Sequence, residues 1–326
     1  MARTKTDKSI WVIFFESLKI YALNLHKFLL YMAFPVLGTL LGLGLIFGLT
    51  YWFSSNISHF IVKYPALENI STFMLVITLL VLPGLLILLK AFWDYLVAYG
   101  ALNSMAEGGL TTGRVYDFPA HNAVVKSRTL TYVMLWILFG IFTVFATFPL
   151  FWVLGGIFFV YFILIFQVFT FDENISAISC FRESLNLIKG KFARTAVLLI
   201  IQGLILFLVY QGLTVLFEVL RLNELMNGMF SIWAMGLPLD EINTVYQKFN
   251  MLITPDMISK YIIANITGFI ALGFTLPLRS ISWTLWYKNI QNKSSAEASV
   301  KKPRKTAQKK LDKNILKRAM QDDEEY

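Results

Sequence analysis

Residues 172–192, DENISAISCFRESLNLIKGKF, lie between two long apolar runs and form the clearest amphipathic pattern in the chain. Asp172 is the expected N-cap of a helix, and Gly190 is the expected residue just past its end. The stretch therefore predicts a helix on a membrane surface over residues 172–190. Its apolar face consists of Ile175, Ile178, Phe181, Leu185 and Ile188, and its polar face of Asn174, Ser176, Ser179, Glu183 and Asn186.

A shorter copy of this pattern lies near the N-terminus. Glu16-Ser17-Leu18-Lys19-Ile20 corresponds to Glu183-Ser184-Leu185-Asn186-Leu187, and Lys27-Phe28 corresponds to Lys191-Phe192. Both blocks run directly into a long apolar segment. We therefore expect two parallel copies of one membrane unit, each led in by a surface helix.

The composition is that of a membrane protein. Of the 326 residues, 57% are hydrophobic and only 15% are charged, which is too apolar for an ordinary soluble domain. A single cysteine excludes an internal disulfide, and the three histidines show no ligand spacing. We therefore expect neither a metal site nor a cofactor.

Six segments are apolar and long enough to cross a bilayer core, which needs about 20 residues per helix. They are residues 28–53, 72–89, 129–149, 151–171, 195–220 and 258–287. Residues 129–171 carry no charged side chain, so they predict a helical hairpin inserted between the two copies. The expected fold is an all-α membrane protein with six transmembrane helices. It forms two parallel repeats of interfacial helix, span, loop and span, around the inserted hairpin.

The remaining segments complete a single membrane domain over residues 1–287. Residues 9–24 predict the first surface helix, residues 106–128 an irregular loop, and residues 288–326 a basic tail. Two small-residue spacings in the first span indicate close helix packing, either within the molecule or in a homodimer. They are formed by Gly38, Gly42, Gly44 and Gly48.

Lysine and arginine predict the orientation. The segments on the side of the two termini hold 24 of the 29 basic residues, against four on the other side. Because basic residues accumulate on the cytoplasmic side of membrane proteins, both termini are expected to be cytoplasmic, in a cell (inner) membrane.

Two stretches resemble a known family. CFRESLNLIKGKFARTAVLL and PLRSISWTLWYKNIQ are similar to the bacterial membrane-domain family found fused to some glycerophosphodiester phosphodiesterases, and to its stand-alone six-span inner-membrane relatives. Glu183 stands where that family often has arginine, and Arg182 stands one place earlier. The resemblance implies six spans with cytoplasmic ends. It implies little about activity, because the stand-alone members are poorly characterised and the phosphodiesterase chemistry belongs to a separate soluble domain for which this sequence shows no pattern.

Charged residues at the predicted inner membrane surface are the candidate functional residues. Lys90 and Asp94 share a helix face, and Arg279 follows 18 uncharged residues near the end of the last span. We expect one charged layer that either anchors the surface helices or binds a lipid head group. Its members are Lys90, Asp94, Arg279, Glu16, Glu183, Lys189, Lys191 and Arg194.

No nucleophile–base set and no phosphate-binding glycine loop occurs, so no catalytic residue and no enzyme activity are expected. We predict a non-enzymatic integral membrane protein that interacts with membrane lipids, anionic ones in particular, or acts as a scaffold or accessory for a protein partner. The alternative is a transporter or permease with a pathway between the repeats, because Pro83 and Pro277 occupy corresponding spans. The basic tail is either disordered or a helix on anionic lipid. No nucleic acid partner is expected, because the acidic end of the tail offsets part of its charge.

Overall fold

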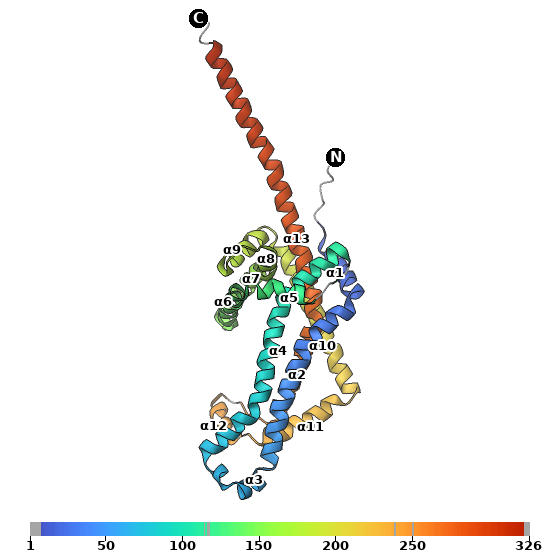
Figure 1. The fold of residues 1–326 in the computed structure, drawn as a ribbon, viewed down its shortest axis with the longest axis vertical. Coiled ribbons are helices and arrows are strands. Elements are labelled where there is room, and N and C mark those ends of the chain that lie inside the picture. Colours follow the sequence, from blue (N-terminus) through green and yellow to red (C-terminus); the bar gives the residue numbers. More distant parts are fainter. Residues whose placement is uncertain (1–7, 114, 116–117, 238, 250, 323–326) are drawn as a thin grey trace.

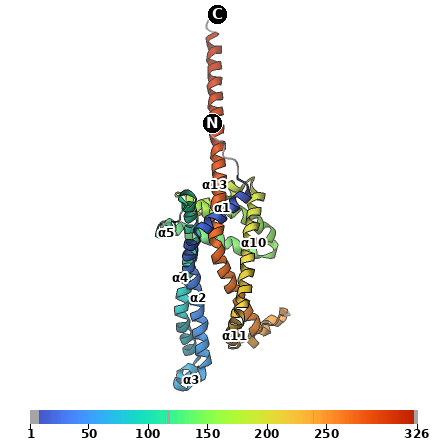
Figure 2. The ribbon, with the colours of Figure 1, turned by 90° about the vertical axis from the view of Figure 1, so that its right-hand side faces the viewer.

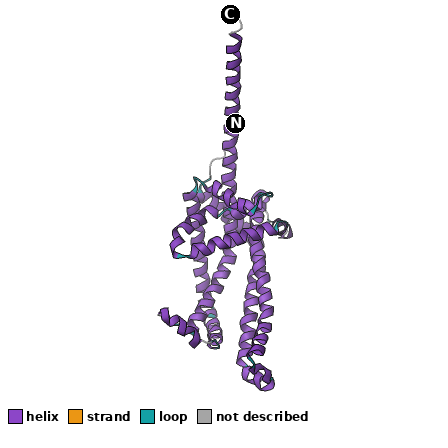
Figure 3. Ribbon diagram, turned by 90° about the vertical axis from the view of Figure 1, so that its left-hand side faces the viewer, coloured by secondary structure: helices purple, strands orange, loops and turns teal. Residues whose placement is uncertain are grey.

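The computed structural model describes residues 8–113, 115, 118–237, 239–249 and 251–322, and in these residues it contains helices, short connections and no strand (Figure 3). The helices are α1 (Ile10–Leu23), α2 (Leu25–Ser55), α3 (Ile57–Lys63), α4 (Ile70–Thr112), α5 (Phe118–Lys126), α6 (Thr129–Thr147), α7 (Trp152–Phe162), α8 (Ile165–Phe171), α9 (Ala177–Ile188), α10 (Phe192–Val219), α11 (Leu222–Met235), α12 (Leu239–Tyr246) and α13 (Pro255–Asp322). Short 3-10 turns are η1 (Pro65–Glu68), η2 (Pro149–Phe151) and η3 (Gln247–Phe249).

Six helical segments are long and apolar enough to cross a membrane. They are Leu25–Ser55, Ile70–Thr112, Thr129–Thr147, Pro149–Phe171, Phe192–Val219 and Pro255–Gln291. The chain is therefore an all-α, multi-span membrane protein, as its sequence predicts.

The molecule has two distinct ends (Figure 1). We call the end that holds α1, α5 and α9, and from which the last part of α13 projects, the terminal face. We call the end that holds α3, α11 and α12 the loop face. The four helices α2, α4, α10 and α13 connect the two faces (Figures 1 and 2).

Helices α2 and α4 pack closely through glycine. A Cβ atom added to Gly42 would lie 2.9 Å from the carbonyl oxygen of Gly84, and one added to Gly84 would lie 2.8 Å from that of Gly42. A Cβ atom on Gly38 would meet Ala91, whereas Gly44 and Gly48 have no atom within 4 Å of that position. Gly38 and Gly42 thus pack within the molecule, because only small residues let two backbones approach so closely.

Helix α11 bridges the two helix pairs at the loop face. It follows α10, packs along α13, and reaches α2 through Trp233, whose Nε1 donates a hydrogen bond to Thr50 Oγ1 at 3.1 Å. The ring of Phe47 on α2 meets the rings of Trp233 and Phe230 edge-on, at centroid distances of 4.8 and 5.1 Å. Residues 221–257, which connect α10 to α13, are therefore largely helical in their described part and close the loop face.

The predicted hairpin is formed by α6, η2 and α7, but it lies across the other long helices rather than alongside them. Figure 1 views α6 nearly end-on, and Figure 2 shows the same hairpin running crosswise. Only the start of α6 meets α4: Tyr132 donates a hydrogen bond to the carbonyl oxygen of Leu96, and Trp136 contacts Tyr99 edge-on. The tip of the hairpin is far from these contacts, and Leu150 there is 85% exposed.

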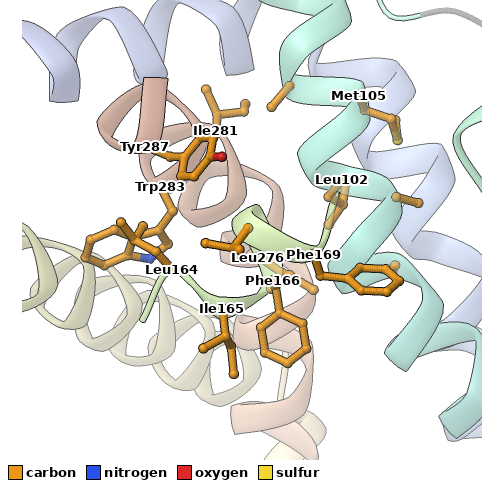
Figure 4. Close-up of a cluster of buried hydrophobic side chains, with 14 of the residues drawn as sticks. Leu102, Met105, Leu164, Ile165, Phe166, Phe169, Leu276, Ile281, Trp283 and Tyr287 are labelled. Carbon is orange, nitrogen blue, oxygen red and sulfur yellow. The ribbon is translucent and has the colours of Figure 1, made fainter. Parts of the chain in front are cut away.

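The buried core lies toward the terminal face, where α8 packs against both α4 and α13 (Figure 4). Leu102 of α4, Phe169 of α8 and Ile281 of α13 are fully buried in it. Trp286 Nε1 joins α10 to this core by donating to Thr195 Oγ1 at 3.1 Å. Burying these apolar side chains supplies the main stabilising term for this layer.

The structure corrects the predicted start of the second surface helix. Asp172 is not its N-cap: α9 begins at Ala177, and the Ser176 hydroxyl accepts the backbone N–H of Ser179 at 3.3 Å. Asp172 instead ends α8, and its carboxylate accepts the N–H of Asn174, which turns the chain before α9 can start. The predicted glycine is confirmed, since Gly190 has a φ of +79° just past the helix end.

Two segment boundaries also differ. Residues 106–128 are not an irregular loop, because α4 continues to Thr112 and α5 follows. Burial of Ala106 and Gly109, the latter against Ile20 of α1, stabilises the helix in spite of its glycines. The last helix does not end near residue 287 but continues to Asp322 (Figure 1), and residues 323–326 of the predicted tail lie outside the described residues.

Candidate functional site

A cavity of about 420 Å³ that holds charged and polar side chains lies between α2, α4 and α5. It brings together residues that are up to 95 positions apart in the chain, and it includes the predicted pair Lys90 and Asp94. Its lining residues are Tyr31, Phe34, Pro35, Lys90, Asp94, Val97, Phe118, Pro119, Asn122 and Lys126.

The cavity is at the depth of a membrane surface. Helix α4 starts at the loop face at Ile70, and the 20 residues from there to Lys90 span about 30 Å at the rise of an α-helix. That length equals the thickness of a bilayer core of about 30 Å. Lys90 and the residues around it therefore reach the level of the lipid head groups on the side of the terminal face.

Lys90 and Asp94 form an ion pair on adjacent turns of α4. The lysine side chain is 69% exposed and the aspartate side chain 34%, so the ammonium group lies at the mouth of the cavity and the carboxylate lies deeper. Exposed pairs of this kind contribute only about 0.3–0.5 kcal/mol to stability. The pair is therefore available for a ligand at little cost to the fold.

Helix α5 supplies a second ammonium group, from the exposed Lys126. Its ammonium group has no hydrogen bond or ion pair to any of the described residues. Asn122, one turn earlier, accepts a hydrogen bond from the buried hydroxyl of Tyr31 at 2.5 Å, which leaves its amide N–H groups available as donors. Two ammonium groups and one carboxylate give the cavity a net positive charge.

Sequence reasoning missed Asn122 and Lys126. They belong to a segment that the sequence predicts to be an irregular loop, because Gly113 precedes it and Pro119 lies within it. The available signal was their spacing of four residues, which places both on one face of a short helix.

Arg279 does not reach this cavity. It is half-buried on α13 and makes no hydrogen bond or ion pair with the described residues. Its neighbour Tyr95 lies on the α13 side of α4, in ring contact with Phe269 at 5.3 Å. Arg279 and Lys90 are therefore on different sides of α4, and the expected charged layer is divided.

The two predicted glutamates have other surroundings. Glu16 pairs with Lys8 at 2.7 Å, and Glu183 lies exposed on α9. Neither forms an ion pair with Lys90 or Arg279. The three basic residues predicted beside α9 follow its last turn, with Lys189 and Arg194 exposed and Lys191 half-buried.

Two further charged contacts at the terminal face hold helices together. Lys288 of α13 pairs with Glu107 of α4 at 2.6 Å, and its ammonium group lies 4.1 Å from the centre of the Phe171 ring. Arg128 donates to the carbonyl oxygen of Asp172 at 2.8 Å and stacks over Phe169 at 4.2 Å. The contacts of Lys288 connect α13 to α4 and α8, and those of Arg128 attach the start of α6 to α8, so both have a structural role.

In the part of the chain that the structure describes, no group of three or more histidine, cysteine or acidic residues is placed to hold a metal ion. Comparison of the chain with protein-family models, with curated proteins and with solved structures finds no match, so its function has to be inferred from the geometry of these residues.

Proposed function

We propose that this protein is a non-enzymatic, lipid-interacting or accessory protein of the cell inner membrane, with both termini cytoplasmic. Its cavity between α2, α4 and α5 binds the phosphate of anionic lipids. The observation that carries the proposal is that two lysines, Lys90 and Lys126, line one cavity whose described lining holds a single carboxylate, that of Asp94. Membership of the membrane-domain family that residues 180–199 resemble belongs to the same proposal.

The chemistry of the cavity suits a lipid phosphate. Lysine binds phosphate as a point charge, and two ammonium groups over one carboxylate leave an uncompensated positive charge at head-group depth. The amide of Asn122 adds neutral N–H donors, and the exposed ring of Phe34 forms an apolar lip against which acyl chains can pack. A bound lipid phosphate would therefore lie close to two ammonium groups and to the amide N–H donors of Asn122. The acyl chains of the same lipid would pack against Phe34.

The test compares retention of phosphatidylglycerol by native mass spectrometry of the full chain released from mild detergent. Lys126→Ala removes an ammonium group that has no protein partner, so the fold is expected to be unchanged and retention to fall about tenfold. Lys19→Ala is the matched control, because Lys19 is an exposed lysine of α1 outside the cavity. Equal retention in wild type and Lys126→Ala would overturn the proposal.

A transporter is the second candidate, and Gln202 favours it. This glutamine is 1% exposed near the middle of α10, and neither its Oε1 nor its Nε2 has a partner in the described residues. Buried amides without partners are rare, and at membrane depth they are functional candidates. Substrate-dependent uptake into liposomes that is lost in Gln202→Leu would favour transport over lipid binding.

A further inference from the structure

A second cavity, of about 390 Å³, lies at the loop face, where the end of α10, helix α11 and the start of α13 meet. It shares no residue with the cavity around Lys90. Ile263 and Ala264 form an apolar part of its wall. Its polar lining includes Tyr210, Asn223, Glu224, Asn227, Lys260 and Thr267.

Asn227, which lines this cavity, has a side-chain oxygen that accepts no hydrogen bond from the described residues. Its amide Nδ2 donates to Asp256 Oδ1 at 3.3 Å, and its main-chain oxygen accepts from Ser259 Oγ at 3.2 Å. Because the carboxylate of Asp256 can only accept, the orientation of the amide is determined by this contact. Asn227 Oδ1 is consequently the atom that is buried without a partner. Asn227 lines the cavity, and χ2 of asparagine is a soft torsion, so this oxygen can be reoriented.

The two charged residues that line the cavity differ in their partners. Lys260 pairs with Asp256 at 2.7 Å, whereas the exposed Glu224 has no ion pair or hydrogen bond to any described residue. The cavity wall itself therefore carries one carboxylate, that of Glu224, and one ammonium group, that of Lys260. Glu224 is in the first turn of α11, where the helix dipole favours a carboxylate, but that role does not require it to line a cavity.

We propose that this cavity binds a primary ammonium group that is carried next to a phosphate. The ammonium group donates to Glu224 and to Asn227 Oδ1, and the phosphate accepts from the Lys260 ammonium group. This chemistry occurs in an aminophospholipid head group and in free phosphoethanolamine. The proposal does not rest on lipid binding at the terminal face, because the two cavities use different residues at opposite ends of the molecule.

The proposal makes a specific distinction between amines. Asn227 Oδ1 requires a hydrogen-bond donor, and a primary ammonium group has three N–H bonds whereas a quaternary ammonium group has none. Phosphatidylethanolamine and phosphatidylcholine carry the same net charge. A preference for the first over the second therefore reports hydrogen bonding rather than charge alone.

The experiment is native mass spectrometry of the full chain, delipidated in detergent and offered phosphatidylethanolamine or phosphatidylcholine with the same acyl chains. Wild type is expected to retain the primary amine about tenfold more strongly. Glu224→Gln should abolish this preference without affecting the fold, since Glu224 has no protein partner. Asn227→Leu should reduce it as well. Glu218→Gln, an exposed carboxylate of α10 outside the cavity, is the control and should behave as wild type.

A parallel titration with free phosphoethanolamine identifies the source of the ligand. Selective binding of the lipid that Glu224→Gln abolishes supports a head-group site, and selective binding of phosphoethanolamine that the same change abolishes supports a soluble ligand. Equal retention of the two lipids together with no binding of phosphoethanolamine overturns the proposal. A selectivity that Glu224→Gln leaves unchanged overturns it too.

Discussion

Some of the glycines in α2 and α4 allow the close approach of the two helices, and others do not. Gly42 and Gly84 face each other with the carbonyl oxygen of each under 3 Å from where a Cβ atom of the other would be. Gly44 lies two residues away on the same helix and faces open space. The sequence pattern treats all the glycines of this span alike, because the spacing of four residues does not say which face meets the neighbouring helix.

This difference gives a matched pair of substitutions. Gly42→Val would place side-chain atoms against the backbone of Gly84, and overpacking of this kind costs on the order of 1–3 kcal/mol. Gly44→Val would face open space and should be nearly neutral. Thermal unfolding followed by size-exclusion chromatography in detergent should show a lower melting temperature for the first variant only. Equal melting temperatures would refute the close approach of the two helices.

Cys180, the one cysteine of the chain, is fully buried in α9. Burial raises the pKa of its thiol from 9.0 to about 12, and the positive charge of Arg128 offsets part of that effect. Since only the thiolate reacts with maleimide, the reactive fraction near pH 8 is about a thousandfold smaller than for an ordinary cysteine. The thiol remains protonated until the pH approaches the raised pKa.

We therefore predict that Cys180 stays unlabelled when the folded protein is treated with maleimide at pH 8, and that it labels fully after denaturation in detergent. Mass spectrometry of the intact chain measures the label. Ser58→Cys, in the exposed α3, provides the reference rate. Labelling of both cysteines at similar rates in the folded protein would contradict the burial of Cys180.

At the scale of elements, the hairpin of α6 and α7 departs most from the expected arrangement. Its residues are apolar and long enough for two spans, and this property was readable from the sequence. Its direction depends on where it is held. Tyr132 and Trp136 attach the start of α6 to α4, and α9 packs against both α6 and α7, so the hairpin extends sideways.

If the hairpin lies crosswise, its tip should not be accessible from the side of the loop face. Leu150→Cys should resist a membrane-impermeant maleimide that is added from the side of the loop face, whereas Ser58→Cys in α3 should react from that side. The buried Cys180 is expected to contribute no label in the folded protein, so it does not interfere with either variant. If Leu150→Cys reacts as readily as Ser58→Cys from that side, the hairpin crosses the membrane as two upright spans.

At the scale of the whole molecule, packing is concentrated at one end. The largest fully buried side chains, Trp286 and Tyr132 among them, belong to the cluster near the terminal face. Along the remaining lengths of α2 and α4, large apolar side chains such as Leu41 and Leu79 are more than half exposed. In a bilayer these surfaces contact acyl chains, which are as apolar as leucine and require no protein cover.

The surface helices of the two proposed repeats, α1 and α9, pack against different parts of the structure. Ser17 and Ser184, which correspond in the two copies, are both fully buried. However, α1 packs mainly on α13, whereas α9 packs on the inserted helices α6, α7 and α8. The repeat thus remains a prediction at the level of sequence, and the inserted hairpin is the physical reason why the two surface helices do not have equivalent partners.

The orientation of the molecule can be tested with reporter fusions. Since basic residues accumulate on the side of the terminal face, we predict that a green fluorescent protein fused to the C-terminus becomes fluorescent, as it folds only in the cytoplasm. Alkaline phosphatase inserted after Ser58 should be active, because it requires the opposite compartment. The reverse pattern of the two reporters would show that the termini lie outside.

The sequence by itself determined the fold class, because apolar runs of about 20 residues have no stable alternative to a helix in lipid. It also determined features that depend on only a few neighbouring residues, such as the glycine just past the end of α9. These features depend on backbone geometry and short-range hydrogen bonds alone.

Only the tertiary structure decided which charged residues meet. Lys126 joins Lys90 because α5 folds back against α4, and Arg279 is separated from both because it lies beyond the other side of that helix. The loop-face cavity likewise exists only where α10, α11 and α13 converge. Contacts of this kind depend on the packing of side chains that are distant in sequence, and neither periodicity nor residue spacing records that packing.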